Sequence, residues 1–545
     1  MTEACRLALA NVLRLSTNGA KLGRANGGFS LMRSVAENGG AVLNALSLLW
    51  RAVVAVIVLP SMVAVSAHAQ NADADDLYSS LAGLRFGVSV TDLDGTVLVS
   101  HRADERFVPA SNGKLFVTAA ALAVEAQLAA LEPGLRVVSE GAEAGPPTLA
   151  LIGRGDPTVG FGPGCTERCI ETLAQAVAAS GITQVGDIVG DDRWFADEPR
   201  PLGWSWDDLK FGHGTSVSAI AVNDNILSLR VSPAKSVGSG VRASWRGTGP
   251  SYFDLLNEAT TSTAQSPRAL RLERRFGDRT ARLYGELPMG SRPIKLDLGV
   301  DNPAHLAAWA FKRALEATGV SVLGELRTRR RPLQYTDEPQ PTNPADAAAQ
   351  VTCGPPDRHA SGGTVIASLP PAPLRQVVTV INQKSQNLYA EVLLRQLGHV
   401  AGTGSSFCGR LHIQKFLEEV GVPRASYDIA DGSGLSSYNR VTPATVTALL
   451  RHAAAAPWGD AYRASLPVGG AKVGTLRYHF RGSALEGKVF AKTGSLNHAD
   501  ALSGYMQARS GRLLAFSIIV NDRPLDAPSA MSQIASTLLT IAARY

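Results

Sequence analysis

Apolar and polar residues alternate in two short runs on either side of a turn-forming Asp-Leu-Asp-Gly segment at 92–95. A period of two with a turn signal between the runs predicts a β-hairpin over 84–100. The pattern then changes to an apolar, alanine-rich stretch over about 111–131, which ends near a Pro-Gly pair and predicts a buried helix. This part of the chain is therefore expected to run strand, strand, helix.

The far end of the chain has a complementary pattern. Apolar runs at 488–493, 501–509 and 513–521 predict three strands, and 529–545 predicts a closing helix. Neither the two strands nor the three would bury a full sheet face alone. We therefore expect both ends to form one five-stranded antiparallel sheet, with the two terminal helices packed together.

The middle of the chain has a different pattern of apolar and turn-forming residues. Between about 148 and 331, short apolar runs are broken by Gly, Pro and Asp, which indicates inserted domains. The stretch 232–298 alternates without a long helical pattern and is interpreted as a separate small β unit. A segment rich in Pro, Arg, Asp and Thr at 327–360 is the expected linker back.

Composition argues against a disordered or fibrous chain, because 45% of the 545 residues are apolar and 18% are charged. This length predicts two or three packed units. The net charge of +6 would suit an anionic partner, but the Lys and Arg residues are scattered along the chain. We expect no nucleic-acid partner and a weak attraction to an acidic wall or membrane surface. A homodimer and a peripheral membrane contact stay open.

The first residues resemble a targeting region. Arg51 precedes the apolar run 52–59, and the small-residue pattern Ala67-His68-Ala69 follows it. This predicts a signal peptide cleaved after Ala69, and hence export to the periplasm. The apolar run is short for a membrane span of about 20 residues, and an uncleaved anchor is the alternative.

Four of the five cysteines fall after the predicted leader, which contains Cys5. In an oxidising compartment Cys165 could pair with Cys169, and Cys353 with Cys408. Zinc is the competing interpretation. It is weaker, because the chain has no His-Glu-x-x-His spacing and the Cys-x-x-x-Cys pair has no nearby partner pair.

The motif Ser111-Asn112-Gly113-Lys114 stands at the start of the first predicted helix. A spacing of three places the first and last side chains on one helical face, so the amine can reach the hydroxyl. Desolvation in the apolar run 115–122 could lower the lysine pKa enough for it to act as a base. Taken singly the motif is weak, because a Ser at a helix start is usually an N-cap.

A second motif, Ser385-Gln386-Asn387, lies between the helical patterns 374–381 and 388–397 and is expected in an exposed turn. A hydroxyl and a carboxamide two residues apart could relay a proton and hold a substrate amide. The same side chains would serve equally well as helix caps.

A third motif, Lys492-Thr493-Gly494-Ser495, ends a predicted strand. A positive charge, a hydroxyl and a glycine that permits close backbone approach suit the capture of a substrate carboxylate. On its own this motif is also an ordinary turn.

The order Ser-x-x-Lys, Ser-x-Asn, Lys-Thr-Gly is the signature of penicillin-binding proteins and serine β-lactamases. Over most of 76–540 the chain resembles the D-alanyl-D-alanine carboxypeptidase/endopeptidase family of class C low-molecular-mass penicillin-binding proteins, the penicillin-binding protein 4 type. Family-like stretches lie at 153–158, 204–208, 222–225, 431–436 and 474–476. Gln386 stands where this family commonly has Asp, and Ser437 where it often has Arg, so substrate contacts are expected to differ.

The resemblance implies an α+β fold, with a penicillin-binding protein or serine β-lactamase-like transpeptidase domain interrupted by two inserted, strand-rich domains. The transpeptidase domain would hold the antiparallel five-stranded sheet and its helices. The expected boundaries are a leader region at 1–69, a discontinuous catalytic penicillin-binding domain at 76–147 and 345–545, inserted domain II at 148–231 and 298–344, and small inserted β domain III at 232–297.

The resemblance also implies a serine-type D-Ala-D-Ala carboxypeptidase, D,D-endopeptidase or both, acting on peptidoglycan stem peptides through an acyl-enzyme and inhibited covalently by β-lactam antibiotics such as penicillin. The expected catalytic residues are Ser111 as nucleophile, Lys114 as base and Ser385 as proton relay. The expected substrate-binding residues are Asn387, Lys492, Thr493, Gly494, Ser495 and Asp208. Asp208 resembles the family's acidic contact to the amino end of a diaminopimelate side chain, and a plain surface carboxylate is the alternative. No metal or organic cofactor is expected.

Two other functions stay open. A β-lactamase shares the three motifs but usually lacks so large an insertion. A peptidoglycan-binding protein with a silent active site would use the same groove without turnover, which the intact Ser111, Lys114 and Lys492 disfavour. The sequence does not fix the balance of carboxypeptidase and endopeptidase action, the oligomeric state or the true start of the chain.

Overall fold

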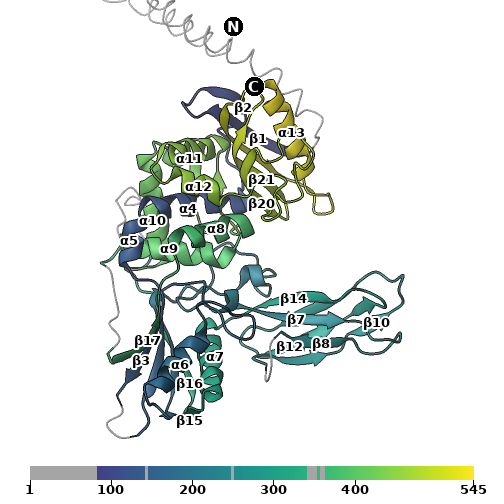
Figure 1. The fold of residues 1–545 in the computed structure, drawn as a ribbon. Helices are drawn as coiled ribbons and strands as arrows, with labels where there is room; N and C mark the ends of the chain where they lie inside the picture. Colours follow the sequence, from purple (N-terminus) through teal and green to yellow (C-terminus); the bar gives the residue numbers. More distant parts are fainter. Residues whose placement is uncertain (1–82, 142–144, 247–250, 340–352, 356–361) are drawn as a thin grey trace, which may run out of the picture. The chain divides into compact units, whose positions relative to one another are not determined.

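The two ends of the chain meet in one sheet, as Figure 1 shows for the computed structural model. Its strands are β1 (Arg85–Asp92), β2 (Val97–His101), β20 (Val489–Leu496), β21 (Ala499–Gln507) and β22 (Leu513–Asn521). Their order is β2-β1-β22-β21-β20, and every neighbouring pair is antiparallel. The five-stranded antiparallel sheet predicted from the sequence is confirmed.

The structure describes residues 83–141, 145–246, 251–339, 353–355 and 362–545. The leader and the cleavage site predicted at 1–69 lie outside these residues. So does much of the predicted linker at 327–360. Among the helices of the described residues, none combines the length and the apolar character needed to cross a membrane.

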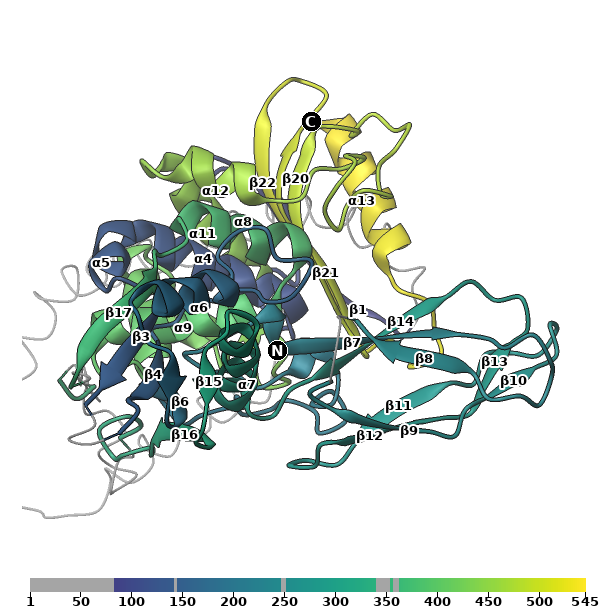
Figure 2. The ribbon, with the colours of Figure 1, turned by 60° about the horizontal axis from the view of Figure 1, so that its bottom comes forward.

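Both faces of this sheet are buried. In β21, Ala501 and Tyr505 pack into the core formed with the helices of one face, whereas Leu502 and Met506 pack with the closing helix on the other. Successive side chains of a strand point to opposite faces, so each face has its own helical cover. Figure 2 shows α13 (Met531–Arg544) on one side of the strands and the remaining helices of the sheet on the other. The first and last predicted helices therefore cover opposite faces, and the prediction that they pack together is wrong.

The helices of that second face carry much of the predicted site. They are α4 (Lys114–Ala123), α5 (Glu125–Ala130), α8 (Leu374–Lys384), α9 (Asn387–Ala401), α10 (Ser406–Glu419), α11 (Pro443–Ala455) and α12 (Gly459–Ser465). The single helix predicted over 111–131 is interrupted. A 3-10 turn precedes α4, and Val124, with φ −120°, separates α4 from α5. A β-branched residue is a weak helix former, which fits a break at this position.

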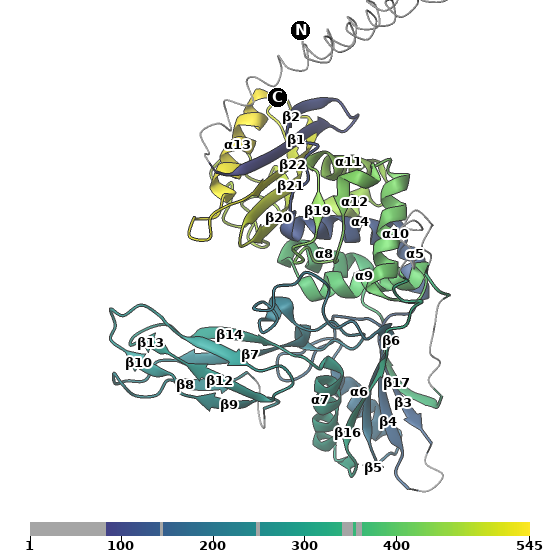
Figure 3. The same cartoon turned by 180° about the vertical axis from the view of Figure 1, so that it is seen from behind.

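A second five-stranded sheet lies in the middle of the chain. Its strands are β3 (Leu135–Glu140), β4 (Thr148–Gly153), β6 (Ile188–Ala196), β16 (Leu326–Arg331) and β17 (Thr364–Leu369), in the order β16-β6-β4-β3-β17. Helices α6 (Ile170–Ala179) and α7 (Pro303–Ala317) pack in its core, as Figure 3 shows. Strands β3 and β17 fall inside the segments predicted for the catalytic domain, so this sheet extends past the predicted limits at 147 and 345.

The interior of the inserted region is built from short strands in small sheets. They are β7 (Ile226–Ser232), β8 (Arg242–Trp245), β9 (Asp254–Asn257), β10 (Thr260–Ser262), β11 (Arg271–Arg274), β12 (Thr280–Tyr284), β13 (Glu286–Pro288) and β14 (Ile294–Gly299). Their orders are β14-β7-β8, β11-β12-β9 and β10-β13. The described part of 232–297 contains no α-helix, which matches the alternation seen in the sequence. The short pairs β5 (Gln184–Val185) with β15 (Ser321–Val322) and β18 (Tyr427–Asp428) with β19 (Arg440–Val441) complete the strands.

Two disulfides join the four cysteines in the pairing that the sequence suggested. Cys165 is bonded to Cys169, and Cys353 to Cys408. The second bridge ties the segment that precedes β17 to α10, across a sequence separation of 55 residues.

Candidate active site

The first motif forms the start of α4. Ser111 lies in the 3-10 turn Ala110–Gly113, and Lys114 is the first residue of the helix. Three residues of helical rise bring the two side chains together, and Lys114 Nζ donates to Ser111 Oγ across 3.1 Å. The side chain of Lys114 is fully buried. The contact and the dry setting predicted from the sequence are both present.

The second motif forms the turn between α8 and α9. Ser385 has the left-handed backbone conformation, with φ 57°, and ends α8. Gln386 is the N-cap of α9, and its side-chain carbonyl accepts from Leu388 N at 3.1 Å. Because Gln386 takes the capping role, the Ser385 and Asn387 side chains are left for other contacts. Gln386 therefore has a structural role as a helix cap, which an Asp at this position could also fill.

Ser385 and Asn387 each contact one of the two lysines of the predicted site. Lys114 Nζ donates to Asn387 Oδ1 at 2.6 Å, and Lys492 Nζ donates to Ser385 Oγ at 2.8 Å. The Asn387 amide group in turn donates to the carbonyl of His213 at 2.9 Å. The second motif thus joins the first motif to the third.

The third motif lies on β20. Lys492 is fully buried and also donates to the carbonyl of Thr493 at 2.8 Å, while the Thr493 hydroxyl contacts the Thr475 hydroxyl at 2.8 Å. A Cβ added at Gly494 would lie 2.8 Å from the carbonyl oxygen of Pro109 and 3.1 Å from the backbone nitrogen of Ser111. Only glycine allows β20 to pass so close to the turn that carries Ser111.

The loop Asp431–Ser436 completes the surroundings of Lys114. The carbonyl of Ser433 accepts a hydrogen bond from Lys114 Nζ. Gly434 has φ 78°, and a Cβ there would lie 1.9 Å from the carbonyl oxygen of Ala110. This loop was noticed in the sequence as family-like, but no role was predicted for it.

Lys114 therefore has three acceptors, on Ser111, Asn387 and Ser433, which match the three N–H donors of an ammonium group. Burial lowers the pKa of Lys114 to about 8, against the opposing charges of Asp431 and Glu391. Burial, followed by repulsion from Lys114, lowers the pKa of Lys492 well below its usual range. Both amines are desolvated, and each holds its proton less tightly than an exposed lysine does.

An open cleft of about 750 Å³ gives access to Ser111. Predicted site residues that line it are Ser111, Ser385, Asn387, Ser495 and Asp208. Lys114, Lys492, Thr493 and Gly494 are not among its lining residues. The first two lie fully buried and reach it through their contacts with Ser111 and Ser385.

Asp208 and Ser495 have more exposed surroundings than the buried residues of the site. Asp208 Oδ1 lies 3.1 Å from Nε2 of His213, which lines the same cleft. The Ser495 hydroxyl donates to Asp500 Oδ1 at 2.8 Å, and Ser495 lines the cleft. No sequence signal pointed to His213, because a single His carries no motif.

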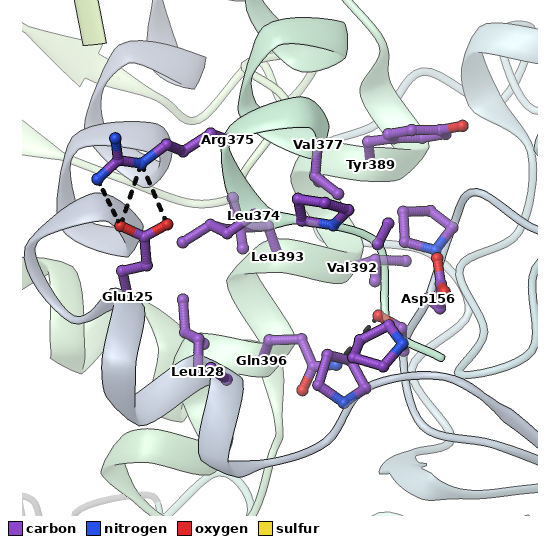
Figure 4. Close-up of a pocket in the computed structure, with 17 residues that line it drawn as sticks. Glu125, Leu128, Asp156, Leu374, Arg375, Val377, Tyr389, Val392, Leu393 and Gln396 are labelled. Atoms are coloured by element: carbon purple, nitrogen blue, oxygen red, sulfur yellow. Dashed lines mark hydrogen bonds and ion pairs between the residues drawn. The ribbon is translucent and has the colours of Figure 1, made fainter. Parts of the chain in front are cut away.

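A second cavity, of about 340 Å³ and mainly apolar, lies between α5, α8 and α9 (Figure 4). An ion pair between Glu125 and Arg375 borders it, with Arg375 Nη2 3.1 Å from Glu125 Oε2. None of the predicted site residues lines this cavity. The cavity is therefore separate from the cleft that leads to Ser111.

Within the part of the chain that the structure describes, one group of metal-type ligands lies close together: Cys165, Cys169 and Glu171. Its two sulfur atoms are bonded to each other, so they do not supply thiolate ligands.

Comparison with known proteins gives consistent matches over most of the chain. The model of the D-Ala-D-Ala carboxypeptidase 3 (S13) family matches residues 68–339 and 349–541. A D-alanyl-D-alanine carboxypeptidase of Actinomadura sp. (strain R39) is 34% identical over 468 residues, which cover 83% of this chain and 80% of the relative. The carboxypeptidase DacB of Haemophilus influenzae is 25% identical over 367 residues, covering 66% and 70% of the two chains.

Among solved structures, penicillin binding protein 4 of Haemophilus influenzae aligns with a TM-score of 0.68 and 23% sequence identity. The alignment covers 86% of this chain and 97% of that one. The two chains share one fold.

Proposed function

Because the chain belongs to the D-Ala-D-Ala carboxypeptidase 3 (S13) family, we propose that it is a serine hydrolase that cleaves after D-alanine in peptidoglycan stem peptides through an acyl-enzyme. The observation that carries this proposal is the contact between Lys114 Nζ and Ser111 Oγ, 3.1 Å apart, with the lysine fully buried. A base beside a hydroxyl is the arrangement that activates a serine nucleophile.

Lys114 acts as the base for Ser111. Once neutral, its amine keeps two N–H groups for Asn387 Oδ1 and the Ser433 carbonyl, and its lone pair faces Ser111 Oγ. The Ser111 proton moves to this amine as Oγ attacks the carbonyl carbon between the two D-alanines. A C–O bond forms, and the carbonyl becomes an oxyanion.

The oxyanion is stabilised by the backbone N–H groups of Ser111 and Ser495. Gly494 supports this role, because it brings β20 within van der Waals contact of the Ser111 backbone. Loss of one such donor typically costs about 100-fold or more in rate.

The leaving amine takes its proton from Ser385. The contact of the Ser385 hydroxyl with Lys492 Nζ, at 2.8 Å, lets this lysine replace the proton given up. The C–N bond breaks and D-alanine departs. Water then attacks the ester, its proton passes through Ser385 to Lys492, and Lys114 returns its proton to Ser111 Oγ as the peptide is released.

The remaining groups hold the substrate. Lys492 and Thr493 bind the terminal carboxylate, and Asn387 orients the substrate amide. Asp208 lines the cleft and binds the amino end of the peptide side chain. β-Lactams acylate the same serine, because their strained amide takes the place of the D-Ala-D-Ala bond. The proposal needs no cofactor.

The two disulfides support an exported protein, because such bonds persist in oxidising compartments. We place the activity outside the cytoplasm, in the periplasm, where peptidoglycan is found.

Three incubations of the purified protein separate this function from its rivals: one with a peptide ending in D-Ala-D-Ala, one with a cross-linked peptide dimer, and one with labelled penicillin. We expect release of D-alanine or of peptide monomer, and slow, stoichiometric labelling. Rapid turnover of penicillin without peptide cleavage would indicate a β-lactamase. The absence of both peptide cleavage and penicillin labelling would indicate a binding protein.

Two variants accompany these incubations. Ser111→Ala should lose all three reactions, and Ser239→Ala, at an exposed position of the inserted region, should keep them. Full labelling of Ser111→Ala would refute the nucleophile.

A further inference from the structure

Two fully buried carboxylates, Glu391 and Asp431, lie beside Lys114 and have no part in the proposed proton transfers. Burying a carboxylate is costly unless it is paired or hydrogen-bonded, so each needs a structural reason. Their surroundings differ, and the difference separates their roles.

Asp431 shapes the loop that follows it. Its two oxygens accept from five neutral donors of the same region: Trp204 Nε1, the Ser433 hydroxyl, Gly434 N, Ser436 N and Asn439 Nδ2, at 2.7–2.9 Å. Its hydrogen-bonding capacity is used within that loop and by the neighbouring tryptophan. Asp431 therefore accounts for the loop conformation.

Glu391 contacts the part of the loop that holds Lys114. It lies on α9 four residues after Asn387, so both side chains are on one face of the helix. Its Oε1 accepts from Ser433 N at 2.8 Å, and the carbonyl of the same Ser433 accepts from Lys114 Nζ. Helix α9 thus holds Lys114 twice, directly through Asn387 and indirectly through Glu391.

The charge of Glu391 matters because the site is rich in buried cations. Lys114 and Lys492 are both fully buried, and Lys114 lies near enough to lower the pKa of Lys492. On its other side, Glu391 Oε2 lies 3.3 Å from Nη1 of Arg395, which is also buried. The negative charge of Glu391 also acts on Arg410. Glu391 and Asp431 are the two anions that act on Lys114.

The pKa of Glu391 fits this role. Burial raises it to about 7, with the charge of Asp431 acting in the same direction and Arg395 opposing it. Burial lowers the pKa of Lys114 to about 8, although the negative charges of Asp431 and Glu391 act to raise it. The pKa of Glu391 thus lies below that of Lys114, so the carboxylate gains its charge before most of Lys114 loses its proton.

Building on the proposed function, we propose that Glu391 is a positioning residue for Lys114: its carboxylate fixes the Ser433 backbone that holds the amine, and its charge sets the pH at which that amine becomes a base. Without the negative charge, the ammonium form of Lys114 is less stable, and the proton leaves at lower pH.

The test is the rate of acylation by labelled penicillin between pH 6 and 9.5, in the full-length protein and in Glu391→Gln. The amide keeps an oxygen for Ser433 N but removes the charge. We expect the midpoint of the rising rate to move to lower pH by about one unit. The plateau rate at high pH should fall much less than in Ser111→Ala.

In the single variant the buried charge of Arg395 loses its anionic partner, which could prevent folding. A double variant, Glu391→Gln with Arg395→Met, removes both charges and keeps the test available in that case. We expect the same downward shift. Asp192→Asn is the matched control: Asp192 is a half-buried carboxylate whose pKa desolvation raises to about 7, and it accepts hydrogen bonds from the Ser218 hydroxyl and Ala219 N in the inserted region. This change should leave the midpoint in place.

The outcomes separate the inference from the proposed function. No labelling of Ser111 in the unaltered protein would end the proposed function. Normal labelling of that protein, with a lower plateau but an unmoved midpoint in both Glu391 variants, would make Glu391 a structural residue only and overturn the inference. A shift to higher pH would overturn it as well.

Discussion

At the scale of single residues, the site depends on desolvated amines. Lys114 and Lys492 are both fully buried, and burial is the largest cause of the lowered pKa of each. A lysine at its ordinary pKa would be protonated at neutral pH and could not accept the Ser111 proton. The apolar packing of α4 is therefore part of the chemistry.

The first prediction concerns pH. In the proposed mechanism the neutral form of Lys114 is the base, and its pKa is about 8, so acylation of the unaltered protein should rise with pH through a midpoint near 8 and then level off. At pH 7 only about a tenth of Lys114 would be neutral. Stopped-flow acylation at a series of pH values measures this. A rate that is flat from pH 6 to 9.5, or that falls, contradicts the assignment of Lys114.

The sequence predicted the residues that carry motifs and missed those that do not. Ser111, Lys114, Ser385 and Lys492 follow fixed spacings, so their types and order pointed to the site. Glu391 has no such spacing. Its charge, one turn after Asn387 and one turn before Arg395, was the one available signal.

At the scale of elements, glycines allow three separate segments to meet at Ser111. Gly494 on β20 approaches Pro109 and the Ser111 backbone, and Gly434 in the 431–436 loop approaches Ala110 from another side. A strand end, a loop and a helix start can share one small volume because these positions lack side chains.

The second prediction follows from Gly494. Its substitution by alanine would place a Cβ 2.8 Å from the Pro109 carbonyl oxygen and 3.1 Å from Ser111 N. We expect β20 to move away and acylation to slow by about 10-fold or more, since the oxyanion donors separate.

The control for this variant is Gly164→Ala, where a Cβ meets nothing within 4 Å. Both proteins should have similar melting temperatures within a few degrees. Unchanged acylation in a folded Gly494→Ala protein would show that close approach at this position is unnecessary.

The elements were predicted well where periodicity was strong. Strands β20, β21 and β22 and the closing helix match the predicted runs to within a few residues. The break at Val124 was missed, because an alanine-rich apolar stretch looks continuous in sequence and the interruption depends on local backbone geometry. The capping role of Gln386 was also missed. A polar residue in a turn can be a helix cap or part of the site, and the sequence does not distinguish the two roles.

At the scale of the whole molecule, the site depends on contacts between distant parts of the chain. Ser111 and Lys492 come from opposite ends of the described residues, and the carbonyl of His213, from the inserted region, accepts from Asn387. The limits of the inserted region could not be predicted from the sequence, because β3 and β17 pair with its strands although they lie beyond the predicted boundaries.

The third prediction concerns the disulfides. In a chain-entropy account, a bridge across 55 residues stabilises by about 4 kcal/mol and one across 4 residues by about 2 kcal/mol. Replacing Cys353 and Cys408 by Ala should therefore lower stability more than replacing Cys165 and Cys169. Urea unfolding of the two double variants measures the difference. The reverse order would contradict the loop-length argument.

The fourth prediction concerns Asp192, whose pKa burial raises to about 7 from an ordinary value of 3.8. The folded state binds this proton more tightly than the unfolded state, so its stabilising effect is full at low pH and is lost as pH rises towards 7. The melting temperature of Asp192→Asn minus that of the unaltered protein should therefore increase from pH 5 to pH 8. An identical difference at both pH values would contradict this.

The most direct test of the account is to find which residue carries the acyl group. The protein is treated with penicillin, digested and analysed by mass spectrometry. We expect one adduct per chain, on the peptide that contains Ser111, and fragmentation that places it on the Ser111 oxygen. An adduct on Ser385 or Ser495, or one that persists in Ser111→Ala, would contradict the account.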